Sequence, residues 1–245
     1  MPVHIYKNPD ELTQALAEWI VHLMGETLAT KERFTWVLSG GNTPKALYQL
    51  LASPAYLGRV PWSKLHIFWG DERDVPFTDS RNNARMAYDS LLNHVPVPAA
   101  QIHVMRTDIE AQASATQYEQ TLRHYFPTPA SGPPSSTFDL VLLGMGEDGH
   151  TLSLFPGTEV VHEETKWVSA YYLKSQDMDR ITLTKKVVNR ATHVVFITTG
   201  ATKAHALQAV LKGPAQTDLY PAQVIKPEHG QLDWFVDQAA AADLG

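Results

Sequence analysis

Apolar positions along the chain switch between two spacings, one typical of strands and the other typical of helices. Short and nearly continuous apolar runs predict buried strands. They occupy 33–38, 64–69, 138–144, 166–173, 180–184 and 193–200. Between them, apolar residues recur every three or four positions and predict amphipathic helices. These helices are expected over 8–28, 43–51, 82–92, 110–125 and 201–213.

Residues that typically start helices support this division of the chain. Asn8 is placed to cap the first helix, with Pro9 in its first turn and Glu11 completing a capping box. Thr43 is the expected cap of the second helix, which would begin at Pro44. Both helices therefore have a predicted N-terminus as well as an apolar face.

The C-terminal part is predicted to end in a strand near 222–227 and a helix over 234–242. A stretch rich in Pro, Gly and Ser at 127–137 is expected to be a long surface loop. Strands that alternate with helices predict an α/β fold, with a Rossmann-like, mostly parallel sheet and helices on both faces. The length fits a single domain of this kind over residues 1–245.

The composition narrows the possible functions without changing the predicted fold. The chain has no cysteine, which excludes disulfides, a thiol nucleophile and a cysteine zinc site. The net charge of −6 and the lack of Lys/Arg-rich runs argue against a nucleic-acid partner. No apolar run approaches a membrane-spanning length, and the N-terminus lacks a signal pattern. We therefore expect no membrane contact and a cytoplasmic location.

Ligands of parallel sheets bind at the carboxyl edge, where strands lead through loops into helices. Four loops of this kind are expected to share one site. They lie at 39–43, 70–83, 144–150 and 200–203. Three of these loops follow strongly apolar strands, so their positions are well defined by the sequence pattern.

The first loop is predicted to bind an anion. It contains Ser39, Gly40, Gly41 and Thr43. Backbone N–H groups of such a glycine turn, together with the N-terminus of the following helix, converge on a phosphate or a carboxylate. A tight turn with an ordinary helix cap is the alternative interpretation. The spacing of a P-loop is absent.

The second loop begins with Asp71, Glu72 and Arg73, directly after a buried strand. Three charged residues in this position usually indicate a solvated loop. In a functional site, Arg73 is the candidate for a fixed cation over an anionic or oxyanionic substrate atom. Asp71 and Glu72 are candidates to bind sugar hydroxyls or to orient Arg73.

The third loop has the G-x-G-x-x-G spacing of a dinucleotide site, through Gly144, Gly146 and Gly149. The motif lies in mid-chain, however, and a Rossmann fingerprint should open the first βαβ unit. Pro156 is also expected to end the following helix after barely two turns, and Asp148 would face the pyrophosphate. We therefore expect no dinucleotide and no other cofactor.

Asp148 and His150 remain as the reactive groups of this loop. An imidazole has an ordinary pKa of about 6.5 and suits proton transfer near neutral pH. Most histidines are structural, however, and the chain has 11 of them. Two cations complete the candidate site. Arg180 lies in a predicted strand, and Lys203 lies in the first turn of a helix, where its charge is unfavourable without a bound anion. A lysine on the surface with no ligand is the alternative.

Taken together, these stretches resemble the 6-phosphogluconolactonase family in its bacterial stand-alone form. The shared stretches, in order along nearly the whole chain, are LSGGNTP, WGDERDVP, GMGEDGHTLSLFPGT, RITLT, TGATKA and YPAQVIKP. The resemblance implies hydrolysis of 6-phospho-D-glucono-1,5-lactone to 6-phosphogluconate in the pentose phosphate pathway. It also implies a sheet related to those of glucosamine-6-phosphate deaminases and sugar-phosphate sensors.

The resemblance also implies roles for individual residues. The phosphate-binding candidates are Ser39, Gly40, Gly41, Arg180 and Lys203, with Thr43 in the same turn. The residues expected to face the lactone are Asp148, His150 and Arg73, with Asp71, Glu72 and Gly146 as further candidates around the ring. The family often has Ser-Asn after the second loop, where this chain has Asn82 and Asn83, so the contacts of these two residues are left open.

Lactone hydrolysis needs a base that activates water, and His150 is the side chain of the four loops with a suitable ordinary pKa. Asp148 is expected to orient its imidazole, and Arg73 or backbone N–H groups of the third loop are expected to stabilise the oxyanion. There is no serine nucleophile elbow and no second histidine at metal-ligand spacing, so we expect neither an acyl-enzyme nor a metal. The expected partner is a small sugar-phosphate lactone, bound by a monomer or a weak homodimer.

Two other functions stay open at this point. The first is a sugar-phosphate isomerase or glucosamine-6-phosphate deaminase, which uses the same kind of phosphate site. Such deaminases share GxDGH with this chain but have a glutamate five positions after the histidine, where this chain has Phe155. The second is a non-catalytic sugar-phosphate sensor. A sensor would need an output module, for which the predicted sheet leaves no segment.

Overall fold

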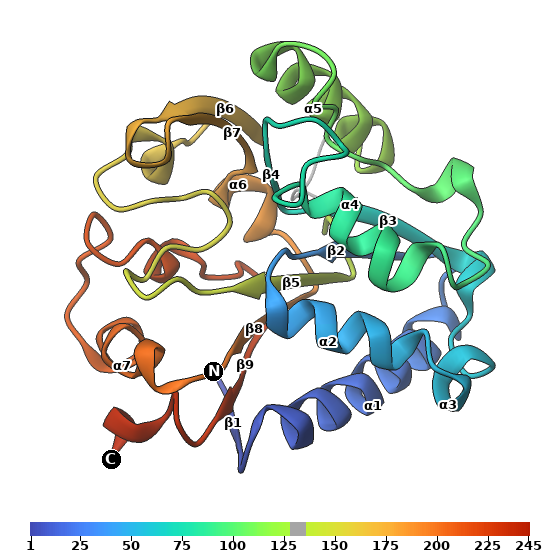
Figure 1. The fold of residues 1–245 in the computed structure, drawn as a ribbon, viewed down its shortest axis with the longest axis horizontal. Helices are drawn as coiled ribbons and strands as arrows, with labels where there is room; N and C mark the ends of the chain where they lie inside the picture. The colour runs from blue at the N-terminus through green and yellow to red at the C-terminus, as the bar shows by residue number, and fades with distance from the viewer. Residues whose placement is uncertain (128–135) are drawn as a thin grey trace.

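A computed structural model describes residues 1–127 and 136–245 of the chain. At its centre is a six-stranded sheet in which all neighbouring strands are parallel (Figure 1). In order across the sheet, the strands are β1 Val3–Tyr6, β9 Gln231–Asp237, β8 His193–Thr198, β5 Leu140–Gly144, β2 Phe34–Leu38 and β3 Leu65–Trp69. Most of the loop predicted at 127–137 lies outside the described residues.

Helices lie on both faces of this sheet (Figure 1). The longer helices are α1 Pro9–Leu28, α2 Asn42–Leu51, α5 Ala111–Tyr125 and α7 Ala204–Lys212. The shorter helices are α3 Pro54–Leu57, α4 Asn83–Ala87 and α6 Lys185–Val188, and a π-helical turn at Tyr88–Leu92 continues α4. Turns of 3-10 helix lie at Trp62–Lys64, Ala99–Gln101, Glu159–His162, Lys174–Gln176, Ala201–Lys203, Pro221–Val224 and Ala242–Leu244. The predicted α/β fold with a parallel sheet is therefore confirmed. Among the described residues, no helix combines the length and the apolar character needed to cross a membrane.

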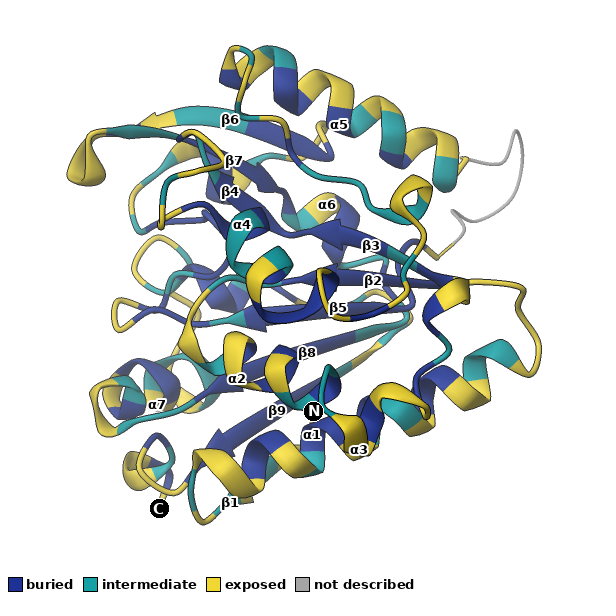
Figure 2. Ribbon diagram, turned by 45° about the vertical axis from the view of Figure 1, so that its right-hand side comes forward, coloured by how far each residue is buried: buried dark blue, intermediate teal, exposed yellow. Residues whose placement is uncertain are grey.

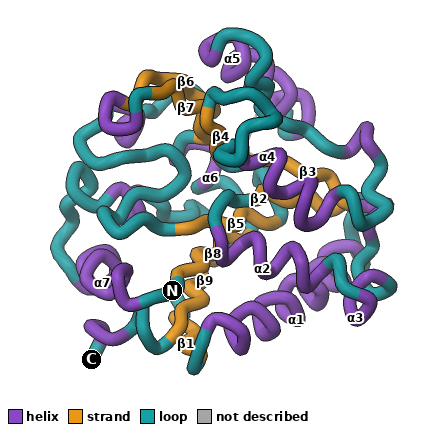
Figure 3. Tube along the Cα trace, viewed as in Figure 1, coloured by secondary structure: helices purple, strands orange, loops and turns teal. Residues whose placement is uncertain are grey.

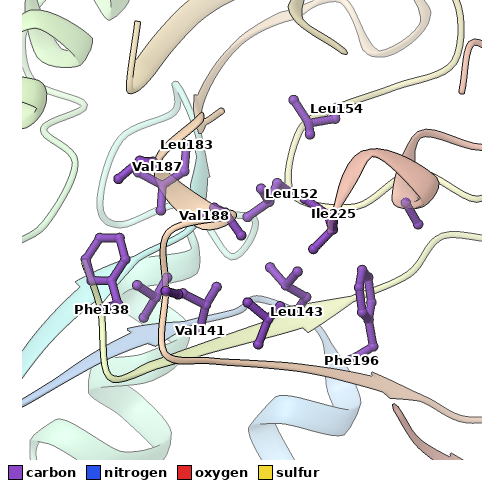
Figure 4. Close-up of a cluster of buried hydrophobic side chains, with 14 of the residues drawn as sticks. Phe138, Val141, Leu143, Leu152, Leu154, Leu183, Val187, Val188, Phe196 and Ile225 are labelled. Atoms are coloured by element: carbon purple, nitrogen blue, oxygen red, sulfur yellow. The ribbon is translucent and has the colours of Figure 1, made fainter. Parts of the chain in front are cut away.

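Two hydrophobic cores, one on each face, hold the sheet between the helices; their buried residues are dark blue in Figure 2. Successive residues of a strand enter different cores, because the side chains of a pleated strand alternate between its two faces. In β2, Trp36 packs in the core that contains residues of α1 and α2, whereas Val37 packs in the core that contains residues of α5 and α7. Figure 4 shows part of this second core, where Leu152 and Leu154 lie above Leu143 of the sheet.

A second sheet has three antiparallel strands in the order β4 Asp71–Arg73, β7 Met178–Leu183 and β6 Val168–Leu173. Strand β4 begins only two positions after β3 ends, so the chain passes directly from one sheet into the other. The sequence pattern did not predict this sheet. Strands β4 and β7 are far apart along the chain, and no local feature of either indicates the other as its partner.

The two C-terminal predictions were wrong. Residues 222–227 form no strand, and a 3-10 turn occupies Pro221–Val224. Residues 234–237 of the expected helix are instead the end of β9, which pairs with both β8 and β1, and residues 238–241 form a turn. Trp, Phe and Val suit a buried strand, and pairing on both sides outweighs the helix propensity of the alanines that follow.

Near the predicted site, one helix starts earlier than expected and another is absent. Helix α2 begins at Asn42, with Gly41 and not Thr43 in the cap position. The short helix expected after His150 does not form. Residues 151–154 make a turn closed by a hydrogen bond from the Leu154 N–H to the Thr151 carbonyl, 2.9 Å from N to O. At the N-terminus, the Asn8 cap is confirmed, because its side chain accepts a hydrogen bond from the Glu11 N–H at 2.9 Å.

Two long connections, from β5 to β6 and from α7 to β9, are mostly loop (Figure 3). Backbone hydrogen bonds join them to each other at two points. The Gly157 N–H donates to the Asp218 carbonyl, and the Ala222 N–H donates to the Gly149 carbonyl, both at 2.9 Å. The second connection therefore supports the turn that carries the predicted reactive residues.

Candidate active site

A pocket of about 250 Å³ lies at the carboxyl edge of the six-stranded sheet, where the four predicted loops meet. It is lined by Ser39, Gly40, Gly41, Asp71, Arg73, Asn83, Gly144, Met145, Gly146, His150, Leu152, Phe155, Gln176, Arg180 and Lys203. A larger hollow of about 790 Å³ opens at the opposite edge, near Lys31 and Asp139, next to residues outside the described part of the chain. It contains none of the predicted site residues, so we place the site in the smaller pocket.

The turn after β2 presents backbone to this pocket. Gly41 has a φ of 104°, which glycine adopts without strain. It occupies the cap position of α2 and has no side chain to accept from the first N–H groups of the helix, so these groups are available to an anion. Gly40 lies directly against Asn83. A Cβ atom on residue 40 would come within 2.0 Å of the Asn83 side-chain oxygen. The turn therefore has no room for a side chain at this position.

Lys203 enters the pocket from the loop after β8, in the cap position of α7. Thr43 does not line the pocket. Its hydroxyl instead lies 2.8 Å from the Thr199 hydroxyl and ties the loop after β2 to the loop after β8. The predicted cation and the predicted glycine turn are therefore held together by a side-chain hydrogen bond.

Asp148 and His150 are paired in the turn after β5. The Asp148 Oδ1 atom lies 2.6 Å from His150 Nδ1 and accepts the His150 backbone N–H at 3.1 Å. Burial raises the pKa of Asp148, but the interactions with His150 outweigh it and hold the pKa of this carboxyl below its ordinary value. An ionised carboxylate at Nδ1 favours the tautomer that has its proton there, which leaves Nε2 able to accept another.

Glycines allow this turn to fold back tightly. Gly149 has a φ of 75°, and a Cβ atom there would come within 2.8 Å of the Tyr220 ring. A Cβ atom on Gly146 would come within 2.1 Å of His150 Nδ1. The Gly146 N–H donates to the His150 carbonyl at 2.8 Å. Gly146 therefore lies directly beside the imidazole, as its place in the motif suggests.

The Phe155 ring stacks on the His150 imidazole, with 4.0 Å between the ring centroids and 20° between the planes. Phe155 is 7% exposed, and the Arg180 guanidinium lies 5.6 Å from the centroid of its ring. The phenyl ring therefore restricts the orientation of the imidazole.

Arg180 and Asp71 form a buried ion pair that the sequence pattern did not predict. Arg180 is 2% exposed and donates to Asp71 Oδ2 at 2.7 Å and to Gln176 Oε1 at 2.8 Å. The Ser153 hydroxyl donates to the same Asp71 oxygen at 2.6 Å. Burial raises the pKa of Asp71, but the charges of Arg180 and Arg73 and these hydrogen bonds hold it below its ordinary value. Asp71 is therefore an ionised partner of Arg180 and is not free for a ligand on that side.

Arg73 lies opposite Arg180 in the pairing of β4 with β7, and its guanidinium contacts the side-chain oxygen of Asn83. Glu72 does not reach the pocket. Its carboxylate accepts the backbone N–H groups of Arg73, Asn83 and Ala84 at 2.7–2.8 Å. Burial raises the pKa of Glu72 to about 7. Of the two roles considered for Glu72, this geometry fits the support of Arg73 and not a contact with a sugar hydroxyl.

Asn83 and Gln176 line the pocket without having been assigned a role from the sequence. The Asn83 amide donates to the Asp71 carbonyl at 2.9 Å, while Asn82 caps α4 by accepting the Arg85 N–H at 2.8 Å. Two asparagines before a helix are a visible signal for a cap. No sequence signal marks Gln176. It reaches the pocket because it lies in the turn between β6 and β7, and the pairing of these strands sets its position.

The charges in and beside the pocket do not cancel. Arg73, Arg180 and Lys203 carry three positive charges, and Asp71 and Asp148 carry two negative charges. The surplus of positive charge favours an anionic ligand. Among the described residues, no group of three His, Asp or Glu side chains is placed to hold a metal ion.

Comparison with known proteins gives consistent results. Residues 7–234 match the family of glucosamine-6-phosphate isomerases/6-phosphogluconolactonase. A 6-phosphogluconolactonase from Synechocystis sp. is 41% identical, over 99% of this chain and 98% of its own length. A probable chloroplastic 6-phosphogluconolactonase from Oryza sativa subsp. japonica is 40% identical, over 98% of this chain and 75% of its own length.

Solved structures agree with this likeness. The 6-phosphogluconolactonase from Trypanosoma brucei superposes with a TM-score of 0.86 at 27% identity, covering 100% of this chain and 98% of that one. A crystal structure of devB protein gives a TM-score of 0.90 at 33% identity, covering 100% of this chain and 99% of that one. A monomeric glucosamine-6-phosphate deaminase, with a TM-score of 0.84 at 19% identity, shares the fold and covers 99% of this chain and all of its own.

Proposed function

The chain belongs to the glucosamine-6-phosphate isomerase/6-phosphogluconolactonase family, and on that basis we propose that this pocket hydrolyses 6-phospho-D-glucono-1,5-lactone to 6-phosphogluconate. The enzyme is a lactone hydrolase of the pentose phosphate pathway. The observation that carries the proposal is the pairing of Asp148 with His150, 2.6 Å apart, in a pocket with surplus positive charge. A general base and an anion site together suit a phosphorylated substrate that is attacked by water.

In the proposed reaction, His150 is the general base. Its Nε2 takes a proton from a water molecule as the water oxygen attacks the lactone carbonyl carbon. The resulting imidazolium is stabilised by the Asp148 carboxylate. When the tetrahedral intermediate collapses, the bond between the carbonyl carbon and the ring oxygen breaks, and the proton on His150 passes to that oxygen. The product is an open-chain acid, which ionises and releases a proton to solvent.

The oxyanion of the intermediate needs a donor or a positive charge close to the carbonyl oxygen. Arg73 is our first candidate, because Asn83 and the backbone contacts of Glu72 hold it at the pocket wall. Backbone N–H groups of the turn at 144–150 are the second candidate. Gly146 lies against the imidazole, so a side chain at this position would displace His150.

The substrate phosphate is proposed to bind at the turn after β2. Gly40 and Gly41 present backbone to it, Ser39 lines the same turn, and Lys203 supplies a charge from the neighbouring loop. Arg180 is proposed to help from the side of the second sheet. Because Asp71 and Gln176 already accept hydrogen bonds from its guanidinium, only its remaining donors are free for the phosphate.

Deamination of glucosamine 6-phosphate is the less favoured activity. The residue five positions after His150 is Phe155, and its ring is stacked on the imidazole and cannot accept or relay a proton. A sensor function is not supported by any specific observation. We further propose a cytoplasmic location, in line with the absence of cysteine, and a monomeric or weakly dimeric protein.

Acid release from freshly prepared lactone, with the spontaneous rate subtracted, tests this proposal. We expect rapid hydrolysis that is insensitive to chelator, and no ammonia from glucosamine 6-phosphate. Ammonia release without lactone hydrolysis above the spontaneous rate would refute the assignment.

A further inference from the structure

Two buried tyrosines make the same unusual contact at the ends of neighbouring strands. The Ser39 N–H donates to the Tyr48 hydroxyl, and that hydroxyl donates to the Ser39 carbonyl, both at 2.9 Å. The Trp69 N–H donates to the Tyr118 hydroxyl at 2.8 Å, and that hydroxyl donates to the Trp69 carbonyl at 3.2 Å. Each hydroxyl thus satisfies both backbone groups of one residue.

The contact of Tyr48 with Ser39 replaces strand pairing at the point where the loop after β2 leaves the sheet. The Leu38 carbonyl accepts from the Gly70 N–H on the side of β3, so the backbone groups of the next residue, Ser39, face the opposite side. Strand β5 lies on that side, but its pairing with β2 covers only Trp36 and Val37. The Tyr48 hydroxyl therefore takes the place of a third ladder partner.

Both hydroxyls are well suited to hold their loops. Tyr48 is 0% exposed and Tyr118 is 3% exposed, so both hydroxyls are held inside the protein, while Ser39 itself is half-buried at the pocket wall. Burial raises the pKa of both phenols far above the ordinary value, which keeps the donated proton in place. The Tyr48 ring is anchored edge-on against Trp36, with centroids 6.1 Å apart.

The two tyrosines hold different parts of the pocket. Ser39 leads directly into Gly40 and Gly41, the proposed phosphate turn, and Tyr48 lies in the helix that this turn starts. Trp69 is the last residue of β3 and leads into β4, which carries Arg73. Loss of one hydroxyl removes the partner of a backbone N–H and of a carbonyl at one loop and leaves the other loop intact.

We propose that Tyr48 is a positioning residue for substrate phosphate, because its hydroxyl fixes the backbone of Ser39 and so sets the geometry of the turn at 39–41. This inference rests on the function proposed above. Tyr48 does not touch the substrate. Its contribution to hydrolysis is therefore specific for phosphorylated lactone. Tyr118 fixes the loop that carries Arg73, and it contributes equally to hydrolysis of phosphorylated and unphosphorylated lactone.

The test compares Tyr48→Phe with the matched variant Tyr118→Phe, on 6-phosphogluconolactone and on unphosphorylated gluconolactone. The measured quantity is the ratio of kcat/KM for the two substrates. We expect Tyr48→Phe to lower this ratio roughly tenfold, mainly through a higher KM for the phosphorylated substrate. Tyr118→Phe should leave the ratio within about twofold of wild type. An unchanged ratio for Tyr48→Phe, or an equal fall for Tyr118→Phe, would overturn the inference.

Two further measurements separate this inference from the proposed function. If the wild-type protein hydrolyses no lactone, the proposed function fails, and amide hydrogen exchange still tests the contact. The Ser39 amide should be protected in wild type and exchange at least about tenfold faster in Tyr48→Phe. If wild type prefers the phosphorylated lactone and Lys203→Ala reduces that preference while Tyr48→Phe does not, the inference alone fails. A Ser39 amide that exchanges freely in wild type refutes it without any variant.

Discussion

Asp148→Asn is the substitution that tests the proposed base most directly. It replaces the carboxylate by an amide of the same shape, so the contact 2.6 Å from His150 Nδ1 can persist without its charge. The carboxylate is expected to stabilise the imidazolium that forms when His150 takes a proton from water. Substrate binding does not involve this charge, so the effect should fall on kcat and leave KM nearly unchanged.

The size of the effect follows from the exposure of the pair. A hydrogen bond to a charged group contributes about 1.5–3 kcal/mol. The side chains of His150 and Asp148 are 28% and 49% exposed, so solvent screens their interaction and the lower half of that range applies. A loss of about 1.5–2 kcal/mol in transition-state stabilisation corresponds to a kcat lower by roughly 10- to 30-fold.

The assay is acid release at saturating lactone, with the spontaneous rate subtracted. Glu147→Gln is the matched control, because it removes the same charge from the exposed neighbouring residue. It should keep wild-type kcat. A kcat for Asp148→Asn within threefold of wild type, or an equal loss in Glu147→Gln, would refute the proposed role of the pair.

Three further outcomes are expected. His150→Asn should keep the circular dichroism spectrum and KM while lowering kcat by about 100-fold or more, and near-normal kcat would remove His150 from the base role. Arg180→Ala should raise KM and also leave Asp71 as an unpaired buried charge, which lowers the free energy of unfolding in urea by about 3–5 kcal/mol; unchanged stability would contradict the buried ion pair. Because the pKa of Glu72 is raised in the folded protein, this residue contributes favourably to the free energy of unfolding below pH about 4.5. That contribution is lost as pH rises through about 7. Between these pH values, the free energy of unfolding should therefore decrease less in Glu72→Gln than in wild type. If the two proteins show the same dependence on pH, the raised pKa of Glu72 is contradicted.

The sequence predicted four of the six strands of the main sheet, β2, β3, β5 and β8, and the meeting of the four loops, because these depend on local signals. Apolar runs such as 34–38 and 140–144 have few alternatives to buried strands, and parallel strands necessarily bring their carboxyl ends to one edge. The stretch 231–237 was mistaken in part for a helix, because four alanines follow it and its pairing partners are not adjacent in the sequence.

Features of the site that depend on distant pairing could not be predicted. Arg180 and Asp71 are separated by 109 positions and meet through the pairing of β4 with β7. The pairing of β6 with β7 brings Gln176 to the pocket. Glu72 illustrates a different limit. A charged residue after a strand usually indicates a solvated loop. The Glu72 carboxylate is instead buried and accepts hydrogen bonds from three backbone N–H groups. Backbone hydrogen bonds of this kind cannot be read from the types of residue in a sequence.

The close contact of Gly40 with Asn83 also limits how sites of this kind can be redesigned. The Asn83 side chain fills the space that a Cβ atom on residue 40 would need, and it also contacts Arg73 and the Asp71 carbonyl. A glycine turn transplanted alone into a related scaffold would therefore meet whichever side chain that scaffold has at the position of Asn83. The turn and the start of α4 form one exchangeable unit, and engineering of a new anion specificity should vary both together.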